Sequence, residues 1–117
     1  MIKLEKDLVA DVVTELMGGT GDVNRLHYAS QDELAGAGRL FAMQKLAPGD
    51  SIGWHTHDGE QEVYVLVNGK ALYNDNGTEV EINAPAVTIC PSGEGHAIKN
   101  IGNDVLEFIG LITNSTE

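Results

Sequence analysis

Two histidines one residue apart, His55 and His57, are followed five residues later by a carboxylate, Glu62. Alternate residues of a β-strand face the same side, so a strand here would direct both imidazoles to one point. A turn at Asp58-Gly59 would bring Glu62 back along the neighbouring strand, and His96 lies in a second glycine-rich stretch downstream. Three imidazoles and one carboxylate suit a divalent transition metal. These four residues therefore predict a metal site.

The stretches that carry these residues read G-x5-H-x-H-x4-E-x6-G over residues 49–69 and P-x-G-x2-H-x3-N over residues 91–100. They resemble the two signature motifs of the cupin superfamily. The first motif matches completely, whereas the glycine expected six residues before the proline of the second is Pro85 here. This departure concerns a turn and leaves the ligand set intact. The resemblance implies an all-β fold, the cupin barrel or double-stranded β-helix, with the metal inside one open end.

The rest of the chain alternates between strand-like runs and turn residues. The dipeptides Asn68-Gly69 and Asn76-Gly77 are typical of two-residue hairpin turns. Strands at such short spacing favour a sandwich or barrel over βαβ units, and 117 residues suit a single domain over residues 1–117. The expected strands cover residues 39–46, 50–57, 61–67, 70–75, 78–83, 86–90, 95–101 and 104–112.

An N-terminal extension over residues 1–37 is expected to precede a barrel over residues 38–117. Apolar residues recur about every four positions between Leu8 and Met17, as in a helix, but the valines and the glycines that follow favour strands. Because small cupins carry extra strands before the barrel, the resemblance favours a hairpin. Ser30 and Glu33 form a capping box, which predicts a single helical turn ending at Gly36.

Strand alternation also predicts which side chains line the pocket around the metal. Each ligand brings in the residues two positions away on its own strand. Tyr64, which has the same parity as Glu62, is either a core aromatic or a catalytic group that hydrogen-bonds a ligand on the metal. The side chains predicted to face inward with the ligands are Gln44, Ser51, Gly53, Tyr64, Leu66 and Ile98.

Other polar residues have simpler interpretations. Glu60 is the rival carboxylate, but its spacing from His57 is shorter than the motif requires. His27 lies outside both motifs, which favours a surface position. Arg39 would neutralise an acidic ligand, but its parity is opposite to that of the inward face of its strand, so we expect it at the surface. Trp54 points away from the site and suits packing or an interface.

The overall composition limits the partners. Lys+Arg 7 against Asp+Glu 18 gives a net charge of −11, which argues against nucleic acid and anionic membranes as partners. The single Cys90 excludes an intramolecular disulfide and lies in an apolar run, which suits a buried thiol. With a charged N-terminus and no long apolar run, the chain is expected to be cytoplasmic.

Cupins with this ligand set include dioxygenases, decarboxylases, isomerases and epimerases, and some only bind a ligand, so the fold does not decide the reaction. A divalent ion (manganese, iron, nickel or zinc) beside one glutamate leaves the site locally positive, which favours a small oxygen-rich anion. Our first hypothesis is a metal-dependent enzyme acting on a keto or hydroxy acid or a sugar derivative. The alternative is a non-catalytic module that binds or senses a small carboxylate.

Apolar residues in the extension predict a two-fold homodimer.

Overall fold

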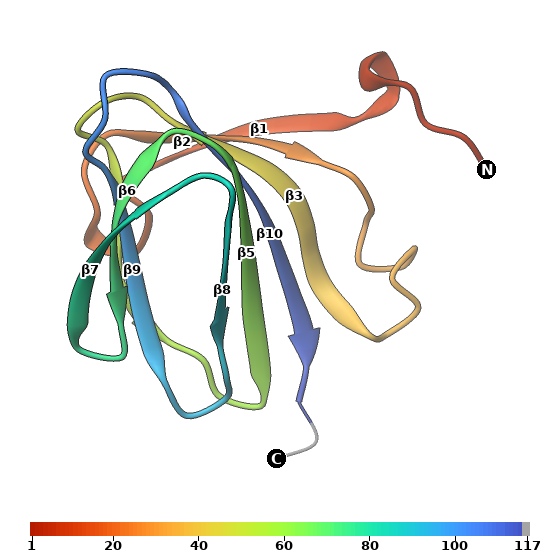
Figure 1. Ribbon diagram of the computed structural model, residues 1–117. Helices are drawn as coiled ribbons and strands as arrows, with labels where there is room; N and C mark the ends of the chain where they lie inside the picture. The colour runs from red at the N-terminus through yellow and green to blue at the C-terminus, as the bar shows by residue number, and fades with distance from the viewer. Residues whose placement is uncertain (116–117) are drawn as a thin grey trace.

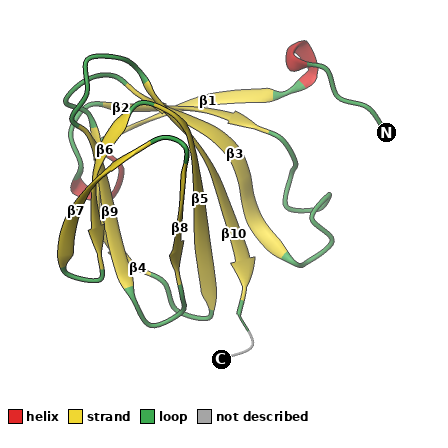
Figure 2. Ribbon diagram, in the orientation of Figure 1, coloured by secondary structure: helices red, strands yellow, loops and turns green. Residues whose placement is uncertain are grey.

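The computed structural model describes residues 1–115, which fold into two facing antiparallel β-sheets (Figure 1). Strands dominate, and two short 3-10 turns, η1 (Glu5–Asp7) and η2 (Leu16–Gly18), are the helical elements of this region (Figure 2). The larger sheet contains, in spatial order, β1 (Val9–Thr14), β2 (Asp22–His27), β3 (Gly38–Leu46), β10 (Leu106–Asn114), β5 (Glu60–Asn68) and β8 (Ala86–Cys90). The smaller sheet contains β4 (Ser51–Thr56), β9 (Gly95–Asn100), β6 (Lys70–Asp75) and β7 (Thr78–Asn83).

The all-β prediction is confirmed, and each of the eight strands expected from residue 39 onward lies within two residues of its predicted bounds. Asn76-Gly77 forms the expected two-residue hairpin between β6 and β7, with positive φ angles of 49° and 106°. The same prediction for Asn68-Gly69 is wrong. There the turn carries the chain from β5 in one sheet to β6 in the other, so the flanking strands do not pair.

The N-terminal segment folds as the predicted hairpin, since β1 pairs with β2 from Val9↔His27 to Thr14↔Asp22. β2 in turn pairs with β3, and Val23 is fully buried. The extension is thus part of the larger sheet and contributes to the core. The predicted capping box is also present, because Glu33 N donates to Ser30 Oγ (3.2 Å) and Ser30 N donates to Glu33 Oε1 (2.9 Å).

Side chains from the inner faces of both sheets fill the space between them. The apolar core consists of Val23, Leu46, Ile52, Tyr64, Leu66, Ala71, Tyr73, Ile98, Leu106 and Phe108. Polar side chains are rarely buried without partners, so each of the few that are buried here needs an explanation. They are Gln44, His57, Glu62, His96 and Asn100. No helix within residues 1–115 is long and apolar enough to span a membrane.

Candidate metal centre

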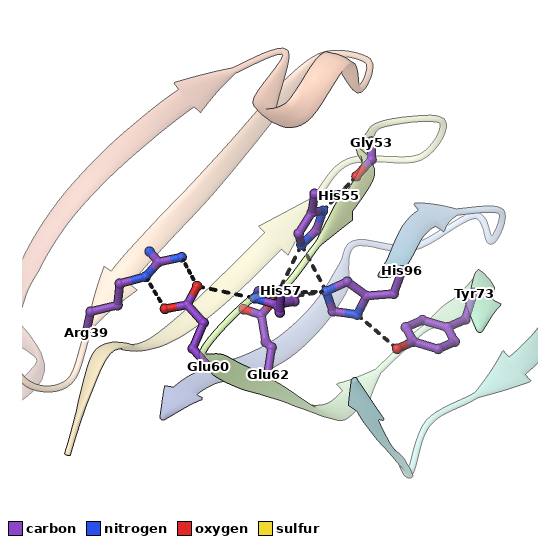
Figure 3. A network of polar contacts seen from close by, with 8 residues as sticks. All are labelled: Arg39, Gly53, His55, His57, Glu60, Glu62, Tyr73 and His96. Carbon is purple, nitrogen blue, oxygen red and sulfur yellow. Dashed lines mark hydrogen bonds and ion pairs between the residues drawn. The ribbon is translucent and has the colours of Figure 1, made fainter. Parts of the chain in front are cut away.

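The structure brings the four predicted ligands together between the sheets (Figure 3). One donor atom from each of His55, His57, Glu62 and His96 lies within 4.8 Å of the others, and we call these residues the His3Glu cluster. His55 on β4 and His96 on β9 are directly opposite one another in the smaller sheet, and His57 follows β4. Glu62 reaches them from β5 in the larger sheet, not from a neighbouring strand as the sequence had predicted.

A β-bulge in β4 sets the direction of the His55 ring. Ile52 pairs with Ile98 and His55 with His96, so three steps along β4 match two steps along β9. The extra residue places Ile52, which is 2% exposed, on the inner face together with His55. The prediction that Ser51 and Gly53 face inward is therefore wrong, because it assumed uninterrupted alternation. The other parity predictions hold, since the buried residues include Gln44, Tyr64, Leu66 and Ile98.

Each imidazole of the cluster has an outer partner at Nδ1. Gly53 O lies 2.8 Å from Nδ1 of His55, and Tyr73 Oη lies 2.9 Å from Nδ1 of His96 (Figure 3). The third partner is Glu60, whose Oε1 is 3.3 Å from Nδ1 of His57. A proton held at Nδ1 by such an acceptor leaves Nε2 with a free lone pair, as in most protein metal sites.

The spacing of the donor atoms fits one metal ion. A metal about 2.1 Å from each donor separates neighbouring ligand atoms by about 3.0 Å at a right angle and about 3.4 Å at a tetrahedral angle. Nε2 of His96 lies 2.9 Å from Nε2 of His55 and 3.2 Å from Nε2 of His57. Glu62 Oε1 is 3.0 Å from His96, 3.2 Å from His57 and 3.6 Å from His55. The four residues thus fit a divalent transition metal in both donor type and spacing.

The electrostatics of the cluster keep its carboxylate ionised. Burial acts to raise the pKa of Glu62, but hydrogen bonds from the three imidazoles outweigh it and hold that pKa well below the ordinary value. The hydrogen bond with Glu62 raises the pKa of His57 against the opposing effect of burial. Burial is the main cause that lowers the pKa of His96. A cation at the centre would replace protons as the partner of Glu62.

A cavity of about 70 Å³ opens beside the cluster. This is much smaller than the roughly 300–1,000 Å³ of drug-sized pockets, so it suits a ligand of a few atoms. Five apolar side chains form much of its wall: Leu16, Met17, Leu40, Ile52 and Ile112. The polar lining outside the cluster consists of Arg25, Arg39, Gln44 and Tyr64.

The rival carboxylate Glu60 lies outside the cluster, in an ion pair with Arg39 at 2.7 Å. This pair lowers the pKa of Glu60 and keeps it ionised beside His57. Arg39 is half exposed, as expected for a surface residue, but it also lines the cavity, which its parity had not predicted. The reason is its length, because a long side chain near the start of a strand can reach around the rim of the cavity.

Residues interpreted as structural are not members of the cluster. His27 is 3.2 Å from Asp11, which also forms an ion pair with Arg25 at 2.7 Å. Trp54 is half exposed on the outside of β4. Cys90 is a buried free thiol, as predicted, and burial raises its pKa to about 11. Such a thiol is almost entirely protonated at neutral pH.

Tyr64 is fully enclosed and its ring stacks on His96 at a centroid distance of 4.8 Å. Burial and the nearby charge of Glu62 raise the pKa of Tyr64 well above the ordinary value. Tyr73, which binds the other edge of His96, was not identified from the sequence. Strand alternation could have predicted its inward direction, because Ala71 and Tyr73 lie two positions apart on β6 and both are buried.

This fold and this cluster define a cupin. The chain belongs to the cupin family, since the model of the cupin domain matches residues 42–112. It is 38% identical over 112 residues to the oxalate-binding protein of Thermotoga maritima, an alignment that covers 96% of this chain and 93% of that protein. A crystal structure of a predicted oxalate decarboxylase from Thermotoga maritima superposes with a TM-score of 0.93 at 37% identity, covering 98% of this chain and all of that one.

More distant relatives share the fold alone. The cupin domain of Cnp3 from Schizosaccharomyces pombe superposes with a TM-score of 0.72 at 14% identity, covering 91% of this chain and 69% of that one. KdgF from a Halomonas species superposes with a TM-score of 0.68 at 15% identity, covering 81% of each chain. The common element is therefore the β-sandwich, and the choice of ligand depends on the side chains inside it.

Proposed function

We propose that this protein holds one divalent transition metal at His55, His57, Glu62 and His96 and uses it to bind a small dicarboxylate such as oxalate. The observation that carries the proposal is the convergence of three Nε2 atoms and one carboxylate oxygen, with an outer partner at every Nδ1. When bound, the metal would supply a Lewis-acid centre for the oxygen atoms of the ligand. The name of the Thermotoga relative supports oxalate as the ligand class.

The charges around the cavity support an anionic ligand. A divalent ion beside Glu62 leaves a net positive charge at the cluster. Arg25 and Arg39 add two guanidinium groups to the lining, although the chain as a whole carries a net charge of −11. The Asp11 and Glu60 partners of these arginines are not among the residues that line the cavity, so they would hold the cations in place without adding negative charge to its wall.

Catalysis is the second candidate function, as a decarboxylase, dioxygenase or isomerase, and the solved relative described as a predicted oxalate decarboxylase supports it. Such reactions need a group that gives or takes a proton next to the ligand. Glu62 is the one carboxylate among the described residues that line the cavity, and it belongs to the cluster. Tyr64 keeps its proton because its pKa is strongly raised, so it suits a hydrogen-bond donor better than a base. Binding therefore has the better support.

The proposal is tested by metal analysis of protein purified without chelator, followed by calorimetry with oxalate and with glyoxylate. We expect about one metal ion per chain and oxalate binding that disappears when the metal is removed. Assays of carbon dioxide release and oxygen uptake on the same sample distinguish turnover from binding. Protein without stoichiometric metal, or oxalate binding that survives metal removal, would contradict the proposal. Unchanged turnover in Tyr64→Phe would exclude a catalytic role for that residue.

A further inference from the structure

Gln44 is a buried side chain that the metal cluster does not use. It lies on β3, is 2% exposed and lines the same cavity as Glu62. Its Nε2 atom is fully enclosed and has no hydrogen-bond partner within the protein. An unpaired buried donor is destabilising, so a residue of this kind inside a cavity points to a partner that arrives with the ligand.

The backbone of the neighbouring strand leaves room for the Gln44 amide. Gly110 on β10 pairs with Ala42 on one side and with Tyr64 on the other. A Cβ atom at Gly110 would lie 2.4 Å from Nε2 of Gln44, closer than side-chain atoms approach one another. The same Cβ would lie 3.5 Å from Oε2 of Glu62, which is an ordinary contact. Glycine at this position therefore leaves room for the Gln44 amide beside the cluster.

We propose that Gln44 is a specificity-determining residue that donates a hydrogen bond from Nε2 to a carboxylate oxygen of the bound anion. This inference rests on the proposed function. The amide nitrogen of glutamine can only donate, so it selects for acceptor atoms. A neutral donor adds no charge to a site that has two arginines and would also hold a metal. Gln44 would therefore distinguish an oxygen acceptor from an apolar or N–H group by hydrogen bonding alone.

The test compares unmodified protein with Gln44→Met, which keeps the length of the side chain and removes the donor. Both proteins are loaded with zinc, and calorimetry measures the dissociation constants for oxalate, glyoxylate and malonate. Loss of a hydrogen bond to a charged group corresponds to about 10–100-fold weaker binding. We expect this loss for oxalate in Gln44→Met, with the zinc content unchanged. Gln31→Met is the matched control, because Gln31 is an exposed loop residue outside this cavity.

A second measurement separates ligand contact from packing. In zinc-loaded protein, the side-chain NH2 signal of Gln44 is assigned by its absence from the nitrogen–proton spectrum of Gln44→Met, and we expect oxalate to shift it. Gly110→Ala provides a second variant, in which Gln44 remains but its amide is displaced, and oxalate binding should again weaken.

Three outcomes are decisive. Weaker oxalate binding in both variants together with the shifted signal supports the inference. Equal affinity in Gln44→Met, or an unmoved signal at saturating oxalate, overturns it and leaves the proposed function intact. If the unmodified zinc-loaded protein binds none of the three acids, both the proposed function and this inference are wrong.

Discussion

Tyr73 Oη lies 2.9 Å from Nδ1 of His96, on the side of the ring that faces away from the rest of the cluster (Figure 3). Burial raises the pKa of Tyr73 to about 12, so the phenol stays neutral and its oxygen can accept the Nδ1 proton of His96. Tyr73→Phe removes this acceptor while keeping the ring. We expect the dissociation constant for zinc to rise about 10-fold, as measured by competition with a chromophoric chelator.

We expect the imidazoles of the cluster to be required for metal binding and the imidazole of His27 to be dispensable for it. His96→Ala and His55→Ala each remove one donor of the cluster, so both should lose stoichiometric metal. His27→Ala is the matched control, because His27 contacts Asp11 outside the cluster. Elemental analysis of the three purified variants checks this. Metal loss in His27→Ala together with full metal content in His96→Ala would show that the ligands are assigned wrongly.

Two glutamates are separated by one residue and should respond differently to the same change. Glu62→Gln removes the anionic donor, and we expect zinc binding to weaken at least about 100-fold because a charged ligand becomes neutral. Glu60→Gln alters an outer partner of His57, and we expect about a 10-fold effect. Titration of zinc into both metal-free variants measures the difference. A larger effect at Glu60 would assign the metal-binding carboxylate to that residue.

Metal affinity should depend on pH through the imidazoles. A histidine binds a metal only when the donor nitrogen is unprotonated, and the raised pKa of His57 means that protons compete for it already above about pH 6.5. Glu62 has a lowered pKa and stays ionised throughout this range. Zinc affinity measured from pH 8.5 to pH 5 should therefore fall as the pH decreases. A constant affinity down to pH 5 would contradict this.

The homodimer is a prediction that depends on the outer edge of the larger sheet. β1 is the edge strand, and Val9 and Val12 on it are 70% and 57% exposed. An apolar strand edge favours pairing with a second copy of the chain. Light scattering at micromolar concentration should give twice the chain mass, and the double variant Val9→Asp/Val12→Asp should give one chain mass. Val80→Asp, on the edge strand β7 of the other sheet, is the control and should stay dimeric. A monomeric intact protein would reject the dimer.

Local sequence patterns predicted most of the fold because strand alternation and turn residues act over short distances. The hairpin at Asn76-Gly77 follows from two residues that accept positive φ. The four donors follow from motif spacing, which depends on strand length and not on which sheet each strand joins. This explains why the cluster was identified although the pairing assumed for Glu62 was wrong.

Features that depend on contacts between distant segments were not predictable in this way. The bulge before His55 places one extra residue in β4 relative to its partner β9. Gly53 was the one local signal for it, because glycine inside a strand often marks a bulge. The Arg39–Glu60 pair and the contact between Tyr73 and His96 join strands that are far apart in the sequence. Predicting them requires knowing which sheet each strand joins.

η2 lies so close to β4 that a Cβ atom at Gly53 would be 2.1 Å from the carbonyl oxygen of Met17. The backbone of η2 therefore cannot move closer to β4 without disturbing the strand that carries His55. The side chains of Leu16 and Met17 are the parts of this wall that remain free to change. Divergence of this scaffold toward ligands of other sizes would consequently proceed by exchanging these two side chains while the backbone beside them stays in place.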